Sequence, residues 1–246
     1  MPASPLPAGI TSPPAIPFTL VPELEKYVHV SGSEIVWRFH GHDKTNDKPY
    51  GPIYFSDKER SRWDFPSTGG VVLSAGTWCA GKSFTGSLLE YFSKGWPSVL
   101  EDKKTKTSLL ASRRVITYYE HTHVYVTRVQ IPEGLRLFDL TKVGAFASIG
   151  YGLDAWVTST KEYQYTRPWA QWFFQCTDID GLVYSSRPGG ADARNYVLFN
   201  RTGLDAKLVE GIGPTRRLGE WANQFKKAQE ELNVIALSAP TPADPI

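Results

Sequence analysis

Cysteine is scarce in this chain of 246 residues, which has only Cys79 and Cys176. Two cysteines are too few for a disulfide framework, so we expect reduced thiols in a cytoplasmic setting. The sequence also lacks any apolar run near the roughly 20 residues of a membrane-spanning helix, and its N-terminus lacks the features of a signal peptide. Positive and negative charges nearly balance, and the formal net charge is only +2. This balance argues against a dedicated nucleic-acid binder, so we expect neither a nucleic-acid nor a membrane partner.

Aromatic residues, by contrast, are abundant: 8 Trp, 12 Tyr and 12 Phe make up 13% of the chain. Disordered and coiled-coil proteins do not have this composition, which indicates a globular protein with an aromatic-rich core. Seven prolines within the first 22 residues predict an extended arm over 1–23. The remaining organisation is predicted to be one folded domain over 24–237 and a flexible tail over 238–246.

Strand patterns outnumber helix patterns and do not alternate regularly with them, which predicts an α+β fold. The predicted strands cover 34–40, 70–75, 114–120, 123–130, 135–139, 181–184 and 196–199. We expect 114–120 and 123–130 to pair as a hairpin. The predicted helices cover 83–91, 168–174 with Pro168 in the first turn, and 218–232.

One short motif suggests a nucleotide phosphohydrolase. The segment Gly76-Thr-Trp-Cys-Ala-Gly-Lys-Ser83 matches the phosphate-binding loop pattern G-x-x-x-x-G-K-[ST] and precedes a predicted helix. Lys82 and Ser83 would then contact phosphate and Asp139 would hold Mg²⁺. The surrounding strands do not predict the parallel βαβ sheet that this fold needs, however. A turn capped by Ser83, with Lys82 in solvent, is the alternative interpretation.

A second, dispersed set of motifs covers most of the chain. Its segments are Val36-Trp-Arg-Phe-His40, Gly51-Pro-Ile-Tyr-Phe55, Arg62-Trp-Asp-Phe-Pro66, Ser87-Leu-Leu-Glu90, Leu137-Phe-Asp-Leu-Thr141, Tyr165-Thr-Arg-Pro-Trp-Ala170 and Asp180-Gly-Leu-Val-Tyr-Ser-Ser-Arg187. In this order and spacing they resemble the RES domain over about residues 34–201. An ordered combination of this length arises by chance far less often than one loop motif, so we prefer this interpretation.

The resemblance implies a fold similar to ADP-ribosyltransferases, with mixed or antiparallel sheets and peripheral helices. RES proteins are typically toxins of bacterial toxin–antitoxin pairs that cleave the nicotinamide–ribose bond of NAD⁺. Their antitoxin partner usually carries a helix-turn-helix domain of the Xre type. The resemblance therefore implies an NAD⁺ glycohydrolase or phosphorylase, with protein ADP-ribosylation as an alternative. A non-enzymatic binding module with an aromatic groove remains a further alternative.

Five residues of this sequence match the motif positions of the family. Arg38, Glu90 and Ser186 are the catalytic candidates, and Arg38, Tyr54, Arg62 and Ser186 are the candidates for binding NAD⁺. Arginines suit the pyrophosphate of NAD⁺, and a carboxylate stabilises the positive charge that develops on the ribose during cleavage. Tyr54 could flank the nicotinamide ring, while Ser186 could hold the ribose or the carboxamide. This mechanism requires no metal.

Each candidate also has a purely structural interpretation. Arg38 could be an ion-paired surface residue, Glu90 a solvated partner of Lys94, and Ser186 a turn residue before Pro188. The pairs His40/His42 and His121/His123 have the spacing of strand residues that share a face, so a metal site is conceivable. Solvation in hairpin loops is the structural interpretation of these histidines, and it is the one that we expect.

Overall fold

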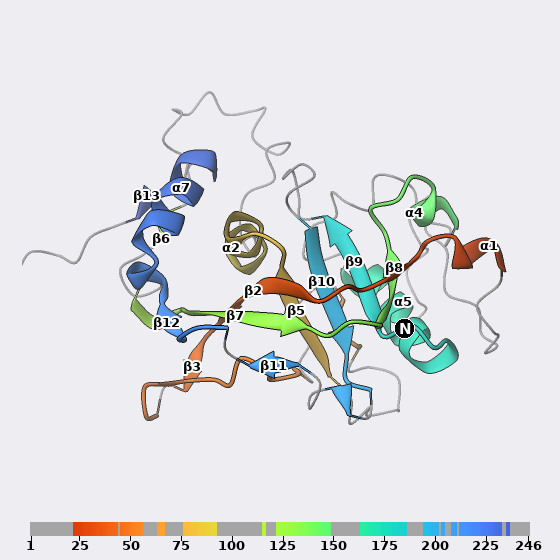
Figure 1. Cartoon of the computed structure of the whole chain (residues 1–246), viewed down its shortest axis with the longest axis horizontal. Coiled ribbons are helices and arrows are strands. Elements are labelled where there is room, and N and C mark those ends of the chain that lie inside the picture. Colours follow the sequence, from red (N-terminus) through yellow and green to blue (C-terminus); the bar gives the residue numbers. More distant parts are fainter. Residues whose placement is uncertain are drawn as a thin grey trace, which may run out of the picture.

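The computed structural model describes most of the predicted domain. The described residues are 22–43, 45–56, 63–66, 76–92, 115–116, 122–148, 163–185, 194–201, 203–204, 208–210, 212–232 and 235–236. They form a mixed α+β domain around one large sheet, as predicted (Figure 1).

The sheet contains nine of the described strands in the order β1-β8-β9-β10-β5-β2-β7-β11, with β12 also paired to β7. These strands are β1 (Val28–Val30), β2 (Glu34–His40), β5 (Thr77–Gly81), β7 (Tyr125–Ile131), β8 (Arg136–Asp139), β9 (Gly181–Ser185), β10 (Arg194–Phe199), β11 (Val209–Glu210) and β12 (Arg216–Arg217). All strand pairs in this sheet are antiparallel except β8 with β9. Two small ribbons complete the described strands: β3 (His42–Asp43) with β4 (Lys48–Pro49), and β6 (Val115–Ile116) with β13 (Ile235–Ala236).

The helices lie at two ends of the sheet. They are α1 (Pro22–Glu25), α2 (Phe84–Phe92), α4 (Ala145–Ser148), α5 (Tyr163–Cys176), the 3₁₀ helix η4 (Leu218–Glu220) and α7 (Ala222–Leu232). Figure 1 shows α2 and α7 near the end formed by β2 and β7, and α5 beside β8 and β9. Within the described ranges, no helix combines the length and hydropathy required to cross a membrane.

The sheet consists of two groups of strands that run in different directions. Strand β5 pairs with β10 over five residues but with β2 only through Trp37 and Gly81. In Figure 1, β2 and β7 accordingly run across the direction of β5, β9 and β10. Because the backbone ladder between β2 and β5 is so short, these neighbouring strands diverge along most of their length.

Alternating strand residues divide the core between the two faces of the sheet. One face carries a continuous cluster that includes Val36, Trp78, Val129 and Leu198. The other face carries two separate clusters. The first packs α5 against β8, β9 and β10, and the second packs α2 and α7 against β2 and β7.

Most predicted elements are confirmed, but two predictions of local structure are wrong. Strand β6 pairs with β13 and β7 pairs with β2, so the described residues of 114–130 do not form the predicted hairpin. Helix α5 begins at Tyr163, which places Pro168 inside the helix rather than in its first turn. The predicted strand over 70–75 lies outside the described residues, and the strand before α2 is Thr77–Gly81.

Candidate functional site

A cavity of about 540 Å³ opens where β2 and β5 diverge. Its walls come from β2, β5, α2, the segment 50–56, Asp64, Tyr184 and Asn195. Phe39 and Tyr184 belong to the two separate core clusters of one sheet face, and both line the cavity. The cavity therefore lies between these clusters, and its volume falls in the usual range for small-molecule sites.

Arg38 forms the cationic part of the cavity wall. Its Nη1 donates a hydrogen bond to the carbonyl of Cys79 on β5, and its Nη2 donates to the carbonyl of Tyr54 at 3.4 Å. The guanidinium also lies 5.4 Å from the ring centroid of Trp78. Burial lowers the pKa of Arg38, while nearby groups that include Asp64 oppose this effect. Since an arginine remains protonated even when shifted, the cavity contains a fixed positive charge.

His40 lies two residues farther along β2 and also lines the cavity. Its Nε2 is 2.9 Å from the hydroxyl of Thr127 on β7, which in turn is 2.7 Å from the hydroxyl of Thr215. Burial, and then the charge of Arg38, lower the pKa of His40 to about 4. The imidazole is therefore neutral at pH 7 and adds no second positive charge beside Arg38.

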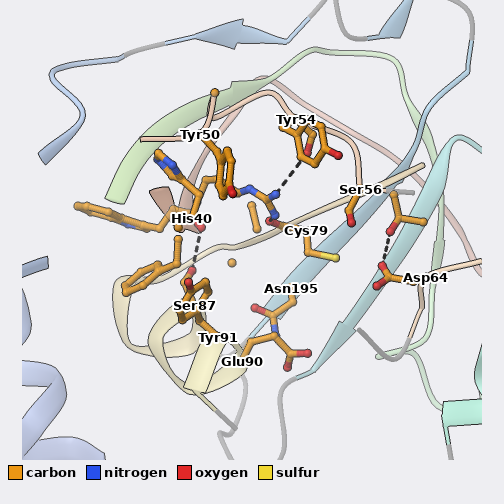
Figure 2. A pocket seen from close by; sticks show the side chains of 18 of the residues that line it. His40, Tyr50, Tyr54, Ser56, Asp64, Cys79, Ser87, Glu90, Tyr91 and Asn195 are labelled. Atoms are coloured by element: carbon orange, nitrogen blue, oxygen red, sulfur yellow. Dashed lines mark hydrogen bonds between the residues drawn. The ribbon is translucent and has the colours of Figure 1, made fainter. Parts of the chain in front are cut away.

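Two carboxylates line the same cavity. Glu90 is partly buried on α2, and Asp64 is almost fully buried and accepts a hydrogen bond from the hydroxyl of Thr77. Figure 2 shows Glu90 and Asn195 toward one end of the cavity and Tyr50 and Tyr54 toward the other. Acidic and cationic groups thus face one space from different elements, an arrangement suited to a ligand with both charges.

The close packing of α2 on the sheet positions Glu90. At Gly81 a Cβ atom would lie 2.7 Å from Asn195 Oδ1 and 2.9 Å from the backbone nitrogen of Ser87, so a glycine is needed there. Ser87 Oγ donates to the carbonyl of Trp37 at 3.0 Å or to that of Ser83 at 2.9 Å. Because Ser87 and Glu90 are three residues apart on a helix, the contact that anchors Ser87 also turns Glu90 toward the cavity.

Tyrosines form the outer wall of the cavity. Tyr50 and Tyr54 stack with their ring centroids 6.5 Å apart, and both side chains are about half exposed. Tyr91, on α2, also lines the cavity. Such aromatic faces on an accessible rim can contact a planar ring of a ligand.

The geometry contradicts the phosphate-binding-loop interpretation. Residues Thr77–Gly81, which would have to form the loop, are strand β5, paired antiparallel with β10. Gly76 packs so closely on Ser56 that a Cβ would lie 2.6 Å from its carbonyl oxygen. The Lys82 side chain is about half exposed, as the alternative interpretation predicts, and its Nζ lies 3.7 Å from a carboxylate oxygen of Glu34. Ser83 caps α2, because its hydroxyl oxygen accepts a hydrogen bond from the backbone nitrogen of Gly86. The alternative interpretation of this segment predicts that role.

Asp139, the candidate Mg²⁺ ligand of that interpretation, has a local role. One of its carboxylate oxygens accepts hydrogen bonds from the backbone and the hydroxyl of Thr141. It therefore stabilises the turn after β8, and β8 is separated from β5 by β9 and β10 in the sheet.

The protein-family model for the RES domain matches residues 35–219. The chain belongs to the RES domain family. The resemblance inferred from the dispersed motifs is thereby confirmed. No curated protein matches the chain. Among solved structures, the chain is similar to one in the crystal structure of the M. tuberculosis MbcT–MbcA toxin–antitoxin complex, with 14% identity and a TM-score of 0.49, covering 82% of this chain and 94% of that one.

The RES domain brings three of the five predicted site residues to one cavity. Arg38, Tyr54 and Glu90 all line it. Ser186 and Arg62 lie outside the described residues. Their described neighbours Tyr184, Trp63 and Asp64 are buried, and Tyr184 and Asp64 line the cavity.

Sequence reasoning did not select Asp64, Cys79 or Asn195 as site residues of this RES domain, yet all three line the cavity. A signal existed for two of them. Asp64 lies between Trp63 and Phe65 and so interrupts a sequence typical of a buried segment, and Asn195 directly precedes an apolar run that begins at Tyr196. Polar residues in such places are either hydrogen-bonded in the core or placed at a site.

Proposed function

We propose that this RES domain cleaves the nicotinamide–ribose bond of NAD⁺. The main support is that one cavity brings together Arg38 and Glu90, two residues that the family resemblance implicates. Membership of the family supports an NAD⁺-related toxin activity, and the fold would then resemble that of ADP-ribosyltransferases.

In the proposed reaction, Arg38 binds the pyrophosphate through the N–H groups that do not hold Cys79 and Tyr54. The bond from the ribose carbon to the nicotinamide nitrogen breaks, and its electron pair leaves with the ring as neutral nicotinamide. Glu90 stabilises the positive charge that this step leaves on the ribose. Water or inorganic phosphate then forms the new bond from oxygen to carbon and releases a proton. Tyr54 flanks the nicotinamide, and Ser186 and Arg62 complete the NAD⁺ contacts.

The decisive experiment measures nicotinamide release from NAD⁺ by the purified full chain. We expect Glu90→Gln to lower this rate about 100-fold or more, because it removes a charge that acts in the transition state. Glu133→Gln is the matched control, since Glu133 is an exposed glutamate in the turn after β7. Lys82→Ala tests the phosphohydrolase alternative with Mg-ATP as the substrate.

Nicotinamide release that is lost in Glu90→Gln and retained in Glu133→Gln and Lys82→Ala supports the proposal. Phosphate release from ATP that depends on Lys82, or inactivity toward NAD⁺ in the wild type, would overturn it. Identification of the second product separates the acceptors. ADP-ribose indicates water, a phosphorylated ADP-ribose indicates phosphate, and labelled protein indicates ADP-ribosyl transfer.

We propose an Xre-like helix-turn-helix antitoxin as the protein partner, on the basis of family membership. A small helix-turn-helix protein encoded beside this chain should form a complex with it and suppress nicotinamide release. Failure of that neighbouring protein to inhibit would remove this partner but leave the proposed NAD⁺ chemistry intact.

A further inference from the structure

Two histidines and an aspartate meet at the β3–β4 hairpin, outside the NAD⁺ cavity. One potential ligand atom from each of His42, Asp47 and His123 lies within 4.8 Å of the other two. His42 Nε2 is 3.8 Å from Asp47 Oδ1, and the rings of His42 and His123 have centroids 4.9 Å apart. The three residues come from β3, from the turn that follows it and from the segment before β7.

Hydrogen bonds around the cluster orient the histidine rings as metal ligands are oriented. His42 Nδ1 is 3.2 Å from the backbone carbonyl of His123, so Nδ1 is the donor there, and Nε2 is the ring nitrogen that faces Asp47 and would bind a metal. His123 Nδ1 is 2.8 Å from the hydroxyl of Thr122, which leaves coordination to its Nε2. A histidine bound to a metal usually donates its other ring N–H to an outer acceptor such as a backbone carbonyl.

The backbone of Asp47 is held by a hydrogen bond within the hairpin, while its half-exposed side chain contacts Arg217. Asp47 is a non-glycine residue with φ of 54°, and its backbone nitrogen donates to the carbonyl of Asp43 at 2.9 Å. Its Oδ2 accepts a hydrogen bond from Arg217 at 3.3 Å, while Oδ1 is the oxygen that faces His42. The two oxygens of the carboxylate are thus divided between an arginine and the histidine side.

We propose that His42, Asp47 and His123 form a binding site for a divalent transition-metal ion, and that this ion is Zn²⁺. Two imidazole nitrogens and one carboxylate oxygen are ligands that Zn²⁺ accepts, with water in the remaining position. Ligand atoms around tetrahedral Zn²⁺ are about 3.3 Å apart, given bonds of about 2.0–2.1 Å. The cluster therefore needs to contract, and Asp47, whose side chain is about half exposed, has room to move.

The ion would brace the outer rim of the cavity. The hairpin that carries His42 and Asp47 is flanked by Gly41 and Tyr50, which are joined by a backbone hydrogen bond of 3.0 Å and both line the cavity. A metal bond to His123 would tie this hairpin to the start of β7. The site is independent of the proposed NAD⁺ chemistry, and the metal would be structural rather than catalytic.

The test titrates the purified full chain, stripped with a chelator, with ZnCl₂ by calorimetry and with Co²⁺ by visible absorption. We expect saturable binding of one Zn²⁺ per chain, a visible Co²⁺ band typical of low coordination number, and a higher thermal unfolding midpoint with Zn²⁺. His123→Ala and Asp47→Asn should each weaken Zn²⁺ binding by about 10–100-fold or more, because each removes a ligand.

His29→Ala is the matched control, because His29 pairs with Glu34 at 3.6 Å on a different strand and lies outside the cluster. It should bind Zn²⁺ as the wild type does. Circular dichroism tests whether each variant is folded. If His123→Ala does not fold, the Zn²⁺ affinity of Asp47→Asn is the deciding measurement. Absence of saturable binding, wild-type affinity in Asp47→Asn, or equal loss in His29→Ala would overturn the proposal.

Discussion

Arg38 connects two segments of the cavity wall that the backbone ladder leaves apart. Its hydrogen bonds reach the carbonyls of Cys79 on β5 and Tyr54 in the segment before it. A planar guanidinium can make both contacts and still present further N–H groups to an anion, because it has five donors in a fixed geometry. A lysine ammonium has three donors on one atom and cannot span the same positions.

Arg38→Lys should therefore lower kcat/KM for NAD⁺ by about 10- to 100-fold, the cost of losing hydrogen bonds to a charged group. Steady-state measurement of nicotinamide release gives this value. The matched control is Arg216→Lys, at an exposed arginine on β12. Unchanged kinetics in a folded Arg38→Lys variant would show that charge alone suffices at this position.

Tyr196 is a buried phenol whose hydroxyl donates to Glu34 at 2.5 Å. Burial, and then the hydrogen bond to Glu34, raise its pKa above the usual value. In the unfolded chain the phenol ionises near pH 10, while in the folded protein it stays protonated to higher pH. The stabilisation is thus complete below about pH 10 and is lost as pH rises further, because the unfolded state releases the proton first.

The free energy of unfolding should accordingly fall above about pH 10, by up to about 1.4 kcal/mol per pH unit from this group. Tyr196→Phe should flatten this decline, and urea unfolding between pH 9 and 11 measures it. Tyr50→Phe, at an exposed tyrosine, provides the comparison. The same slope in Tyr196→Phe and the wild type would show that Tyr196 does not contribute.

At the scale of elements, the packing of α2 on β5 depends on Gly81. The Cβ of any other residue would overlap Ser87 and approach Asn195. Gly81→Ala should reduce the free energy of unfolding by about 2–3 kcal/mol, the upper part of the usual range for overpacking. It should also reduce nicotinamide release, because displacement of α2 moves Glu90.

Denaturant unfolding of Gly81→Ala against Gly32→Ala gives the comparison, since no heavy atom lies within 4 Å of a Cβ at Gly32. Adding Ser87→Gly to Gly81→Ala removes the overlapping hydroxyl and should restore part of the stability. Full stability in Gly81→Ala alone would mean that α2 can shift without cost.

The sequence predicts elements better than it predicts their partners. The alternation in 34–40 defines β2 with the observed bounds, because half-buried strands have a period of two. The hairpin prediction for 114–130 fails because β7 instead pairs with β2, about 90 residues earlier in the chain. Similarly, a P-loop pattern at Gly76–Ser83 turns out to be a strand, with glycines required by close packing rather than by phosphate.

At the scale of the whole molecule, the cavity is assembled from segments distant in sequence. Arg38, Tyr54, Glu90 and Asn195 meet only because the sheet order places β2, β5 and β10 side by side. Composition and period cannot predict that order. The family resemblance selected Arg38, Tyr54 and Glu90 because ordered motifs retain information about the fold that local patterns lack. It did not select Asn195, nor did it group Asp47 with His42 and His123, although they meet in the fold.

The short ladder between β2 and β5 has a consequence for hydrogen exchange. Two backbone hydrogen bonds join Thr77 to Ser56, on the side of β5 away from β10. Because the direction alternates along a strand, the amides of Thr77 and Cys79 point toward this edge, and those of Trp78 and Ala80 point toward β10. The edge that bears Cys79 meets β2 only at Trp37 and borders the cavity. Because the Cys79 amide lies on the edge that borders the cavity, NAD⁺ bound there should slow its exchange with deuterium more than the exchange of its two neighbours. Amide-resolved NMR measures this contrast, and an equal effect of NAD⁺ on the three amides would mean that the ligand does not cover this edge of β5.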